Sequence, residues 1–106
     1  MKFMINNSPS MAQAQTIKQL KELNKENGLH FFERDTMRFF NSRIQRNDPY
    51  NGCVFVTSES NGYYGQRLYT VRAMHSNGAV STISEFQEFT TREEAHKAAK
   101  FLASKY

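Results

Sequence analysis

The spacing of apolar residues predicts a first helix from about residue 9 to 27. Within this stretch a thin apolar stripe recurs at helical intervals among lysines and glutamates, and it consists of Met11, Ala14, Ile17, Leu20 and Leu23. Ser8 and Pro9 suit the beginning of a helix, and Gly28 suits its end. A stripe this narrow favours a peripheral helix that lies on the outside of the domain or docks on a partner.

Two further helices are expected on either side of a β-rich stretch. In ERDTMRFFNSRI, the apolar residues Met37, Phe40 and Ile44 share one helical face. At the C-terminus, TTREEAHKAAKFLASKY begins with a threonine cap and an acidic first turn. Its apolar face is formed mainly of small residues, namely Ala95, Ala98, Ala99, Leu102 and Tyr106. Small side chains allow this helix to pack closely on a sheet.

Between these helices the apolar pattern changes to that of strands, with CVFVTS, RLYTVRAM and AVSTISEFQEF as the candidates. Asn77-Gly78 predicts a two-residue hairpin turn, which would pair Ala73 with Thr82 and Tyr69 with Phe86. The opposite face of this hairpin is mostly polar and is expected to be wet. Most phenylalanines are assigned to the core, namely Phe31, Phe32, Phe39, Phe40, Phe55, Phe86 and Phe89.

These elements predict an α+β fold with the order α-α-β-β-β-α. We expect a three-stranded antiparallel sheet with its helices packed on one face. The length of 106 residues fits a single domain over residues 1–106, with its core at about 30–106.

Composition adds only mild constraints on function. The net charge of +4 shifts the expectation slightly toward polyanionic partners. The single cysteine excludes an intrachain disulfide. No stretch has the apolar core of a signal peptide or the length of a membrane span, so we expect a cytoplasmic protein without a membrane partner.

Candidate catalytic chemistry is sparse. His30, His75 and His96 fall in separate elements and show no metal-ligand spacing with Cys, Asp or Glu. Cys53 lacks the sequence surroundings of a nucleophile, and no glycine-rich phosphate loop is present. We therefore expect no catalytic residue, no metal and no cofactor. An enzyme that uses Cys53 or a histidine is the least favoured class.

Three groups of residues are candidates for binding. The first is a set of arginines that could grip phosphates or carboxylates: Arg34, Arg38, Arg43 and Arg46. The second is a basic ridge on the last helix: Arg92, His96, Lys97 and Lys100. For each basic set, an ordinary solvated face that nearby acids dilute is the favoured interpretation. The third is Tyr63-Tyr64, in a glycine-flanked loop where the rings could anchor a partner or cover a sheet edge.

The residues from about Glu33 to Tyr106 resemble a double-stranded-RNA-binding domain in outline. TTREEAHKAAKFLA is similar to the last helix of that family, which opens with Lys-Lys-x-Ala-Lys. Arg92 takes the first basic position and Ala95 the alanine, whereas Glu93 and His96 replace the other basic residues. The resemblance implies that the start of this helix contacts phosphates across the groove, although Glu93 would repel them.

A second resemblance covers about residues 30–102. The segments FFERDTMRFFNSRI, VFVTSES, RLYTVR and ISEFQEFTTREEA resemble small proteins of bacteriophages and other mobile elements. This resemblance implies an accessory product that acts in the cytoplasm of a bacterial host.

Two functions follow as hypotheses. The leading one is a non-catalytic phage or mobile-element protein that binds a host protein target, such as host machinery or a defence complex. The alternative is direct binding of nucleic acid through the arginine set and the basic ridge. The sequence leaves open whether the chain is a monomer or a homodimer.

Overall fold

A computed structural model describes residues 10–60 and 66–106 of the chain. The described chain folds into three helices and four strands, in the order α1 (Ile17–Glu26), α2 (Arg34–Phe39), β1 (Arg43–Ile44), β2 (Val54–Ser60), β3 (Arg67–Met74), β4 (Val80–Thr82) and α3 (Arg92–Ala103). The strands form one antiparallel sheet in the order β1-β2-β3-β4. The mixed α+β class is confirmed, but the sheet has four strands rather than three.

The additional strand β1 comes from a segment that was predicted to be helical. The second helix ends at Phe39 because Asn41 takes a positive φ of 52°. The Asn41 N–H then donates to Arg38 O (3.1 Å), and the Ser42 N–H donates to Met37 O (2.6 Å). This pair of bonds is a Schellman motif, which ends a helix and reverses the chain. Ile44 therefore lies in a strand and not on the helical face assigned to it.

The hairpin between β3 and β4 is shifted by one residue from its predicted register. Ala73 pairs with Ser81 instead of Thr82. A two-residue type I′ turn would need a positive φ at both Asn77 and Gly78, and only Gly78 has one (85°). The connection is therefore a three-residue loop in which the glycine occupies the left-handed position.

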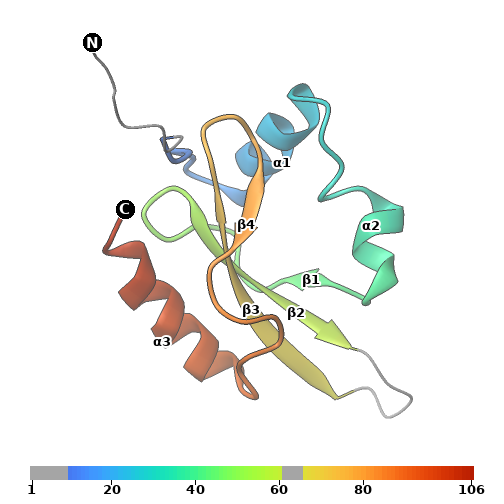
Figure 1. The fold of residues 1–106 in the computed structure, drawn as a ribbon, viewed down its shortest axis with the longest axis vertical. Helices are drawn as coiled ribbons and strands as arrows, with labels where there is room; N and C mark the ends of the chain where they lie inside the picture. Colours follow the sequence, from blue (N-terminus) through green and yellow to red (C-terminus); the bar gives the residue numbers. More distant parts are fainter. Residues whose placement is uncertain (1–9, 61–65) are drawn as a thin grey trace.

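Both faces of the central strands are buried, so the predicted wet face is wrong. Val56 and Val71 point to one face, and Thr57 and Thr70 point to the other, yet all four side chains are buried. Helix α3 packs on β2 and β3. The opposite face carries Arg72, whose guanidinium lies over Phe31 in the segment that joins α1 to α2, and those two helices lie on this side of the sheet (Figure 1). The helices thus lie on both faces rather than on one.

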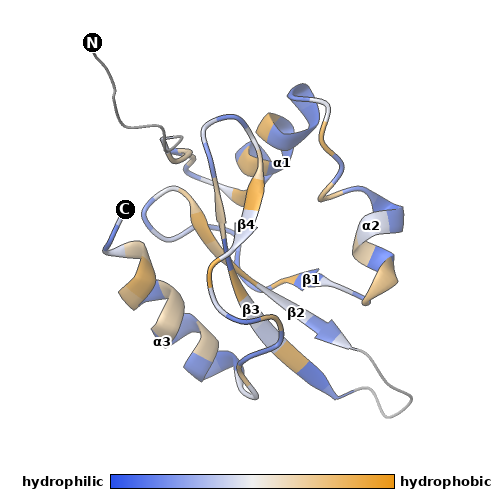
Figure 2. Ribbon diagram, viewed as in Figure 1, coloured by the Kyte–Doolittle hydropathy of each residue, from blue (hydrophilic) through white to orange (hydrophobic). Residues whose placement is uncertain are grey.

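Helix α3 has the start that its sequence predicts and most of the predicted apolar face, but Tyr106 lies beyond its end and is exposed. The Thr91 hydroxyl caps the helix by accepting a hydrogen bond from the Glu94 N–H (3.2 Å). Ala95, Ala99 and Ala103 follow at four-residue intervals and are buried. These small residues bring the helix close to the sheet, while its polar residues face outward (Figure 2).

Helix α1 begins later than predicted and contributes to the core. Ser8 and Pro9 lie outside the described residues, and residues 10–16 form no helix. A capping box of Thr16 and Gln19 starts the helix at residue 17. Leu20 is fully buried in the same cluster as the strands. None of the described helices has both the length and the apolar character that crossing a bilayer requires.

Helix α1 is fixed to the sheet through the β3–β4 loop. The Asn24 side chain donates to Gly78 O (2.8 Å) and accepts from the Phe31 N–H (3.1 Å). A Cβ on Gly78 would lie 2.8 Å from Leu23 O, so only glycine permits this close approach.

We expect Gly78→Ala to destabilise the protein more than Gly28→Ala does. Both glycines have a positive φ, so both variants carry a backbone penalty of about 1–2 kcal/mol. Only Gly78 also has a backbone oxygen in the way, because a Cβ on Gly28 would meet nothing within 4 Å. Urea unfolding of the two variants measures the difference. Equal losses would show that the contact between α1 and the loop is not tight.

Candidate binding site

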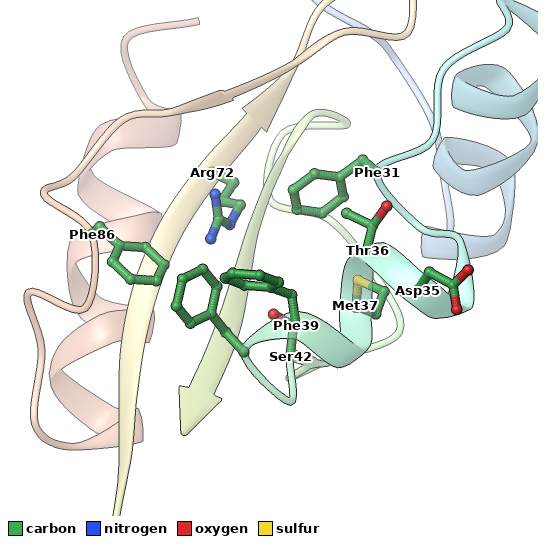
Figure 3. Close-up of a pocket in the computed structure, with 9 residues that line it drawn as sticks. Phe31, Asp35, Thr36, Met37, Phe39, Ser42, Arg72 and Phe86 are labelled. Carbon is green, nitrogen blue, oxygen red and sulfur yellow. The ribbon is translucent and has the colours of Figure 1, made fainter. Parts of the chain in front are cut away.

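An open groove with a volume of about 530 Å³ lies on the sheet face that also carries α1 and α2. It is termed the aromatic groove here, and Figure 3 shows its side chains. Its apolar lining consists of Phe31, Met37, Phe39, Phe40 and Phe86. Its polar lining consists of Asp35, Thr36, Ser42 and Arg72. The groove brings together residues that are more than forty positions apart in the chain.

The aromatic side chains of this groove are exposed, although the sequence pattern assigned them to the core. Phe39 is 77% exposed, Phe86 45% and Phe40 37%. The Phe40 ring centroid lies 4.6 Å from that of Phe39 and 5.1 Å from that of Phe86. The three rings therefore form one continuous apolar surface. Contiguous exposed apolar surface of this kind is typical of interaction sites.

The end of α2 fixes one wall of the groove. Because the Schellman motif ends this helix at Phe39, the two adjacent phenylalanines stay beside the turn instead of entering the core. The Phe40 carbonyl accepts a hydrogen bond from the Ser60 N–H (2.8 Å), which ties the turn to the end of β2.

The opposite wall is a segment that leaves the sheet after β4 and then returns to it. Tyr69 was predicted to pair with Phe86 but forms a bridge with Phe89 instead, with N–H to O distances of 2.8 and 3.1 Å. The residues between β4 and this bridge are therefore free to bulge outward. Gln87 takes a positive φ of 58°, and its N–H donates to Thr70 Oγ1 (2.8 Å). The bulge holds Phe86 at the groove.

The floor of the groove is an ion pair set into the sheet. Arg72 Nη2 lies 3.2 Å from Glu59 Oε2, and the Glu59 side chain is fully buried. The hydroxyls of Thr57 and Thr70 donate to the two oxygens of the same carboxylate. Arg72 also donates to Thr57 Oγ1 (2.9 Å) and to Thr82 Oγ1 (2.8 Å). These bonds compensate the burial of the carboxylate.

Arg72 remains a possible donor to a ligand. Its guanidinium lies 5.2 Å from the Phe31 ring centroid and 5.8 Å from that of Phe86. Three of its five N–H groups have partners among the described residues. One N–H on each terminal nitrogen is left, so an acceptor that enters between the two rings can bind there.

The predicted arginine set is divided by the structure. Arg34 and Arg38 are exposed on α2. Arg43 lies on β1, and Arg46 follows that strand, with its guanidinium 4.3 Å from the Tyr50 ring centroid. Arg43 and Arg46 line one depression, and Arg34 and Arg38 are not among its lining residues.

The basic ridge of α3 meets the Arg46 region. Arg92 Nη2 donates to Gln45 O (3.0 Å), and the Tyr50 hydroxyl lies 2.7 Å from His96 Nδ1. Burial lowers the pKa of His96, and the charges of Arg92 and Arg46 lower it further. Lys97 and Lys100 are exposed on the same helix. The predicted tyrosines Tyr63 and Tyr64 lie outside the described residues.

The thiol and the histidines do not converge. Cys53 directly precedes β2 and is buried, and burial raises the pKa of its thiol. His30 lies 2.8 Å from Glu33, whereas His75 contacts Ser81. Within the described chain, no three His, Cys, Asp or Glu side chains are grouped as a metal ion would need.

We expect Arg72→Met to destabilise the fold by about 3–5 kcal/mol, because it leaves the buried Glu59 carboxylate without its cation. The matched control is Arg38→Met, which removes an exposed arginine from α2 and should change stability by less than about 0.5 kcal/mol. Urea unfolding measures both. A double variant, Glu59→Gln with Arg72→Met, should recover part of the loss. Equal stability of the two single variants would contradict a structural role for this pair.

We also expect stability to fall when the pH drops below about 6.5, the ordinary pKa of histidine. The folded state lowers the pKa of His96, so the unfolded chain binds the proton more readily. The contribution of His96 to stability is complete above its pKa in the unfolded chain. It is lost as the pH falls toward its lower pKa in the folded state. Urea unfolding at several pH values should show a smaller acid loss for His96→Gln. An NMR titration that gives His96 an ordinary or raised pKa would contradict the assignment.

The comparisons with known proteins give a family and no activity. No curated protein and no solved structure matches the chain. A family described as a family of unknown function, DUF7447, matches residues 16–100. The match runs from the cap of α1 into α3 and includes every residue of the aromatic groove. Because it spans well over half of the sequence, this chain belongs to that family of unknown function, DUF7447.

Proposed function

We propose that this chain is a non-catalytic binding protein that holds an apolar side chain of a protein partner in the aromatic groove. The observation that carries the proposal is the exposure of Phe39, which is 77% accessible beside Phe40 and Phe86. Interaction sites concentrate aromatic residues in this way, since a partner that covers them removes apolar surface from water.

The charges of the groove favour a protein segment over a nucleotide. Among the described residues, Arg72 is the one cation that lines it, and the Glu59 carboxylate already neutralises it. Asp35 adds a negative charge at the rim. The described lining of the aromatic groove therefore has no excess of positive charge with which a phosphate could pair. An aromatic or long aliphatic side chain fits the walls, and the carbonyl oxygen next to it can accept from the remaining Arg72 N–H groups.

The sequence resemblance to bacteriophage and mobile-element proteins supports a bacterial host protein as the partner. Under this proposal the chain is an accessory product that acts inside the host cell. The partner is then a component of host machinery or of a defence complex.

The resemblance to a double-stranded-RNA-binding domain supports no function for the start of α3. Glu93 and Glu94 are exposed in the first turn of this helix, where they would repel a phosphate backbone. The sheet also differs, because β1 adds a fourth strand and helices cover both faces.

The proposal is tested by selection of a random peptide library on the immobilised protein. We expect enriched peptides to share an aromatic or long aliphatic anchor and to lose affinity at least tenfold against Phe39→Ala/Phe86→Ala, which corresponds to about 1.4 kcal/mol or more. The same double variant should also fail to capture the protein that the wild type recovers from bacterial lysate.

The matched control is Phe101→Ala, because Phe101 is 63% exposed on α3, on the other side of the sheet. It should retain both the peptide and the lysate partner. Thermal unfolding checks that all variants are folded. We expect them to be, because the three phenylalanines that are replaced are exposed. Peptides that bind the groove variant and the wild type equally, or a library without enrichment, would overturn the proposal.

A further inference from the structure

A second groove lies on the other side of the turn that follows α2, and the proposed protein contact does not use it. Its volume is about 680 Å³, and it runs between α1 and the β1 edge of the sheet. Its cations are Lys18 and Lys21 on α1, Arg43 on β1 and Arg46 after that strand. It is termed the basic groove here.

Among the residues that the structure describes, no carboxylate lines this groove. Over residues 10–60 and 66–106 the ion pairs are those of His30 with Glu33 and of Arg72 with Glu59, and neither involves a cation of the groove. Four like charges that line one depression repel one another. A fold that places them there without acids gains most when an anion enters.

The positive charge extends beyond the groove along the chain from β1. Arg46 stacks on the Tyr50 ring, and the Tyr50 hydroxyl contacts His96 on α3. After burial, the charges of Arg92 and Arg46 are the causes that lower the pKa of His96. Arg92 and His96 of α3 therefore lie near Arg46, although the first turn of this helix also carries the exposed Glu93 and Glu94.

The lining of the groove also includes the apolar residues Ile17, Met37 and Ile44, which distinguishes it from a simple charged surface. A ligand that suits this lining combines repeated negative charges with less polar groups. The phosphodiester backbone has this character, because its phosphates can pair with the cations and its sugars can contact the apolar residues. An acidic peptide offers the charge, but its carboxylates lie on flexible side chains.

We propose that the basic groove binds the phosphodiester backbone of a nucleic acid, with the α1 lysines and the β1 arginines holding successive phosphates. This site uses none of the phenylalanines of the aromatic groove and makes no use of the start of α3, although Met37 and Ser42 line both grooves. Each phosphate contact releases condensed counterions, so the affinity must fall steeply with salt.

Fluorescence anisotropy of labelled single-stranded RNA, single-stranded DNA and duplexes of both, titrated with the full chain from low to moderate salt, tests the proposal. We expect binding at low salt to at least one of these probes. The triple variant Lys18→Gln/Lys21→Gln/Arg43→Gln should lower the slope of log affinity against log salt by about 2 to 3, because each lost contact removes about 0.7 to 0.9.

The matched control is Lys25→Gln/Lys97→Gln/Lys105→Gln. It removes three exposed lysines that do not line the basic groove, and its net charge equals that of the first triple variant. It should keep nearly the whole salt slope. The aromatic-groove variant Phe39→Ala/Phe86→Ala should bind the oligonucleotide with the affinity of the wild type. This result would separate the test from that of the proposed function. Thermal unfolding shows whether each variant is folded, and NMR shifts of the wild type on adding the oligonucleotide should fall in residues 16–21 and 43–47.

Three results would overturn the proposal. The first is no binding to any probe at low salt. The second is an equal loss in the two triple variants, which would indicate attraction by overall charge. The third is displacement of the oligonucleotide by polyglutamate at an equal concentration of charge, which would identify the groove as a site for acidic protein segments.

Discussion

The burial of one carboxylate constrains much of this structure. Glu59 lies inside a sheet whose two faces are both covered, where a lone negative charge would cost several kcal/mol. The fold therefore brings Arg72 and the hydroxyls of Thr57 and Thr70 onto the same face of β2 and β3. The guanidinium that compensates this charge also lies beside the Phe31 and Phe86 rings and lines the aromatic groove. The same ion pair thus stabilises the sheet and forms part of the groove.

The sequence predicts the parts of the fold that depend on local patterns. The β-rich runs identify β2 and β3, and a threonine cap with alanines at helical spacing identifies α3. The errors arise where the backbone conformation of a single residue decides the outcome. Asn41 ends α2 early, and Asn77 lacks the positive φ of a two-residue turn. Apolar spacing gives no information on either conformation, so β1 and the hairpin register could not be predicted.

The candidate sites were partly predictable. Arg43 and Arg46 of the basic groove were predicted as binding residues, whereas Lys18 and Lys21 were not. The structure brings Arg46, Arg92 and His96 together around Tyr50. The aromatic groove was missed because its rings were counted as core. A local signal did exist, since adjacent phenylalanines at the end of a helix cannot both face one core. Their meeting with Phe86 depends on the bulge after β4, which no local pattern indicates.

The turn after α2 has a consequence for the whole surface. Met37 and Ser42 line both grooves. The hydrogen bond from the Ser42 N–H to Met37 O joins these two residues across the turn. A ligand in either groove would therefore contact the same two residues. If a ligand in one groove changes the affinity of the other groove, a ligand in the other groove must change the affinity of the first by the same factor, because linkage between two binding equilibria is reciprocal. A six-residue helix would then connect two recognition events of opposite chemistry.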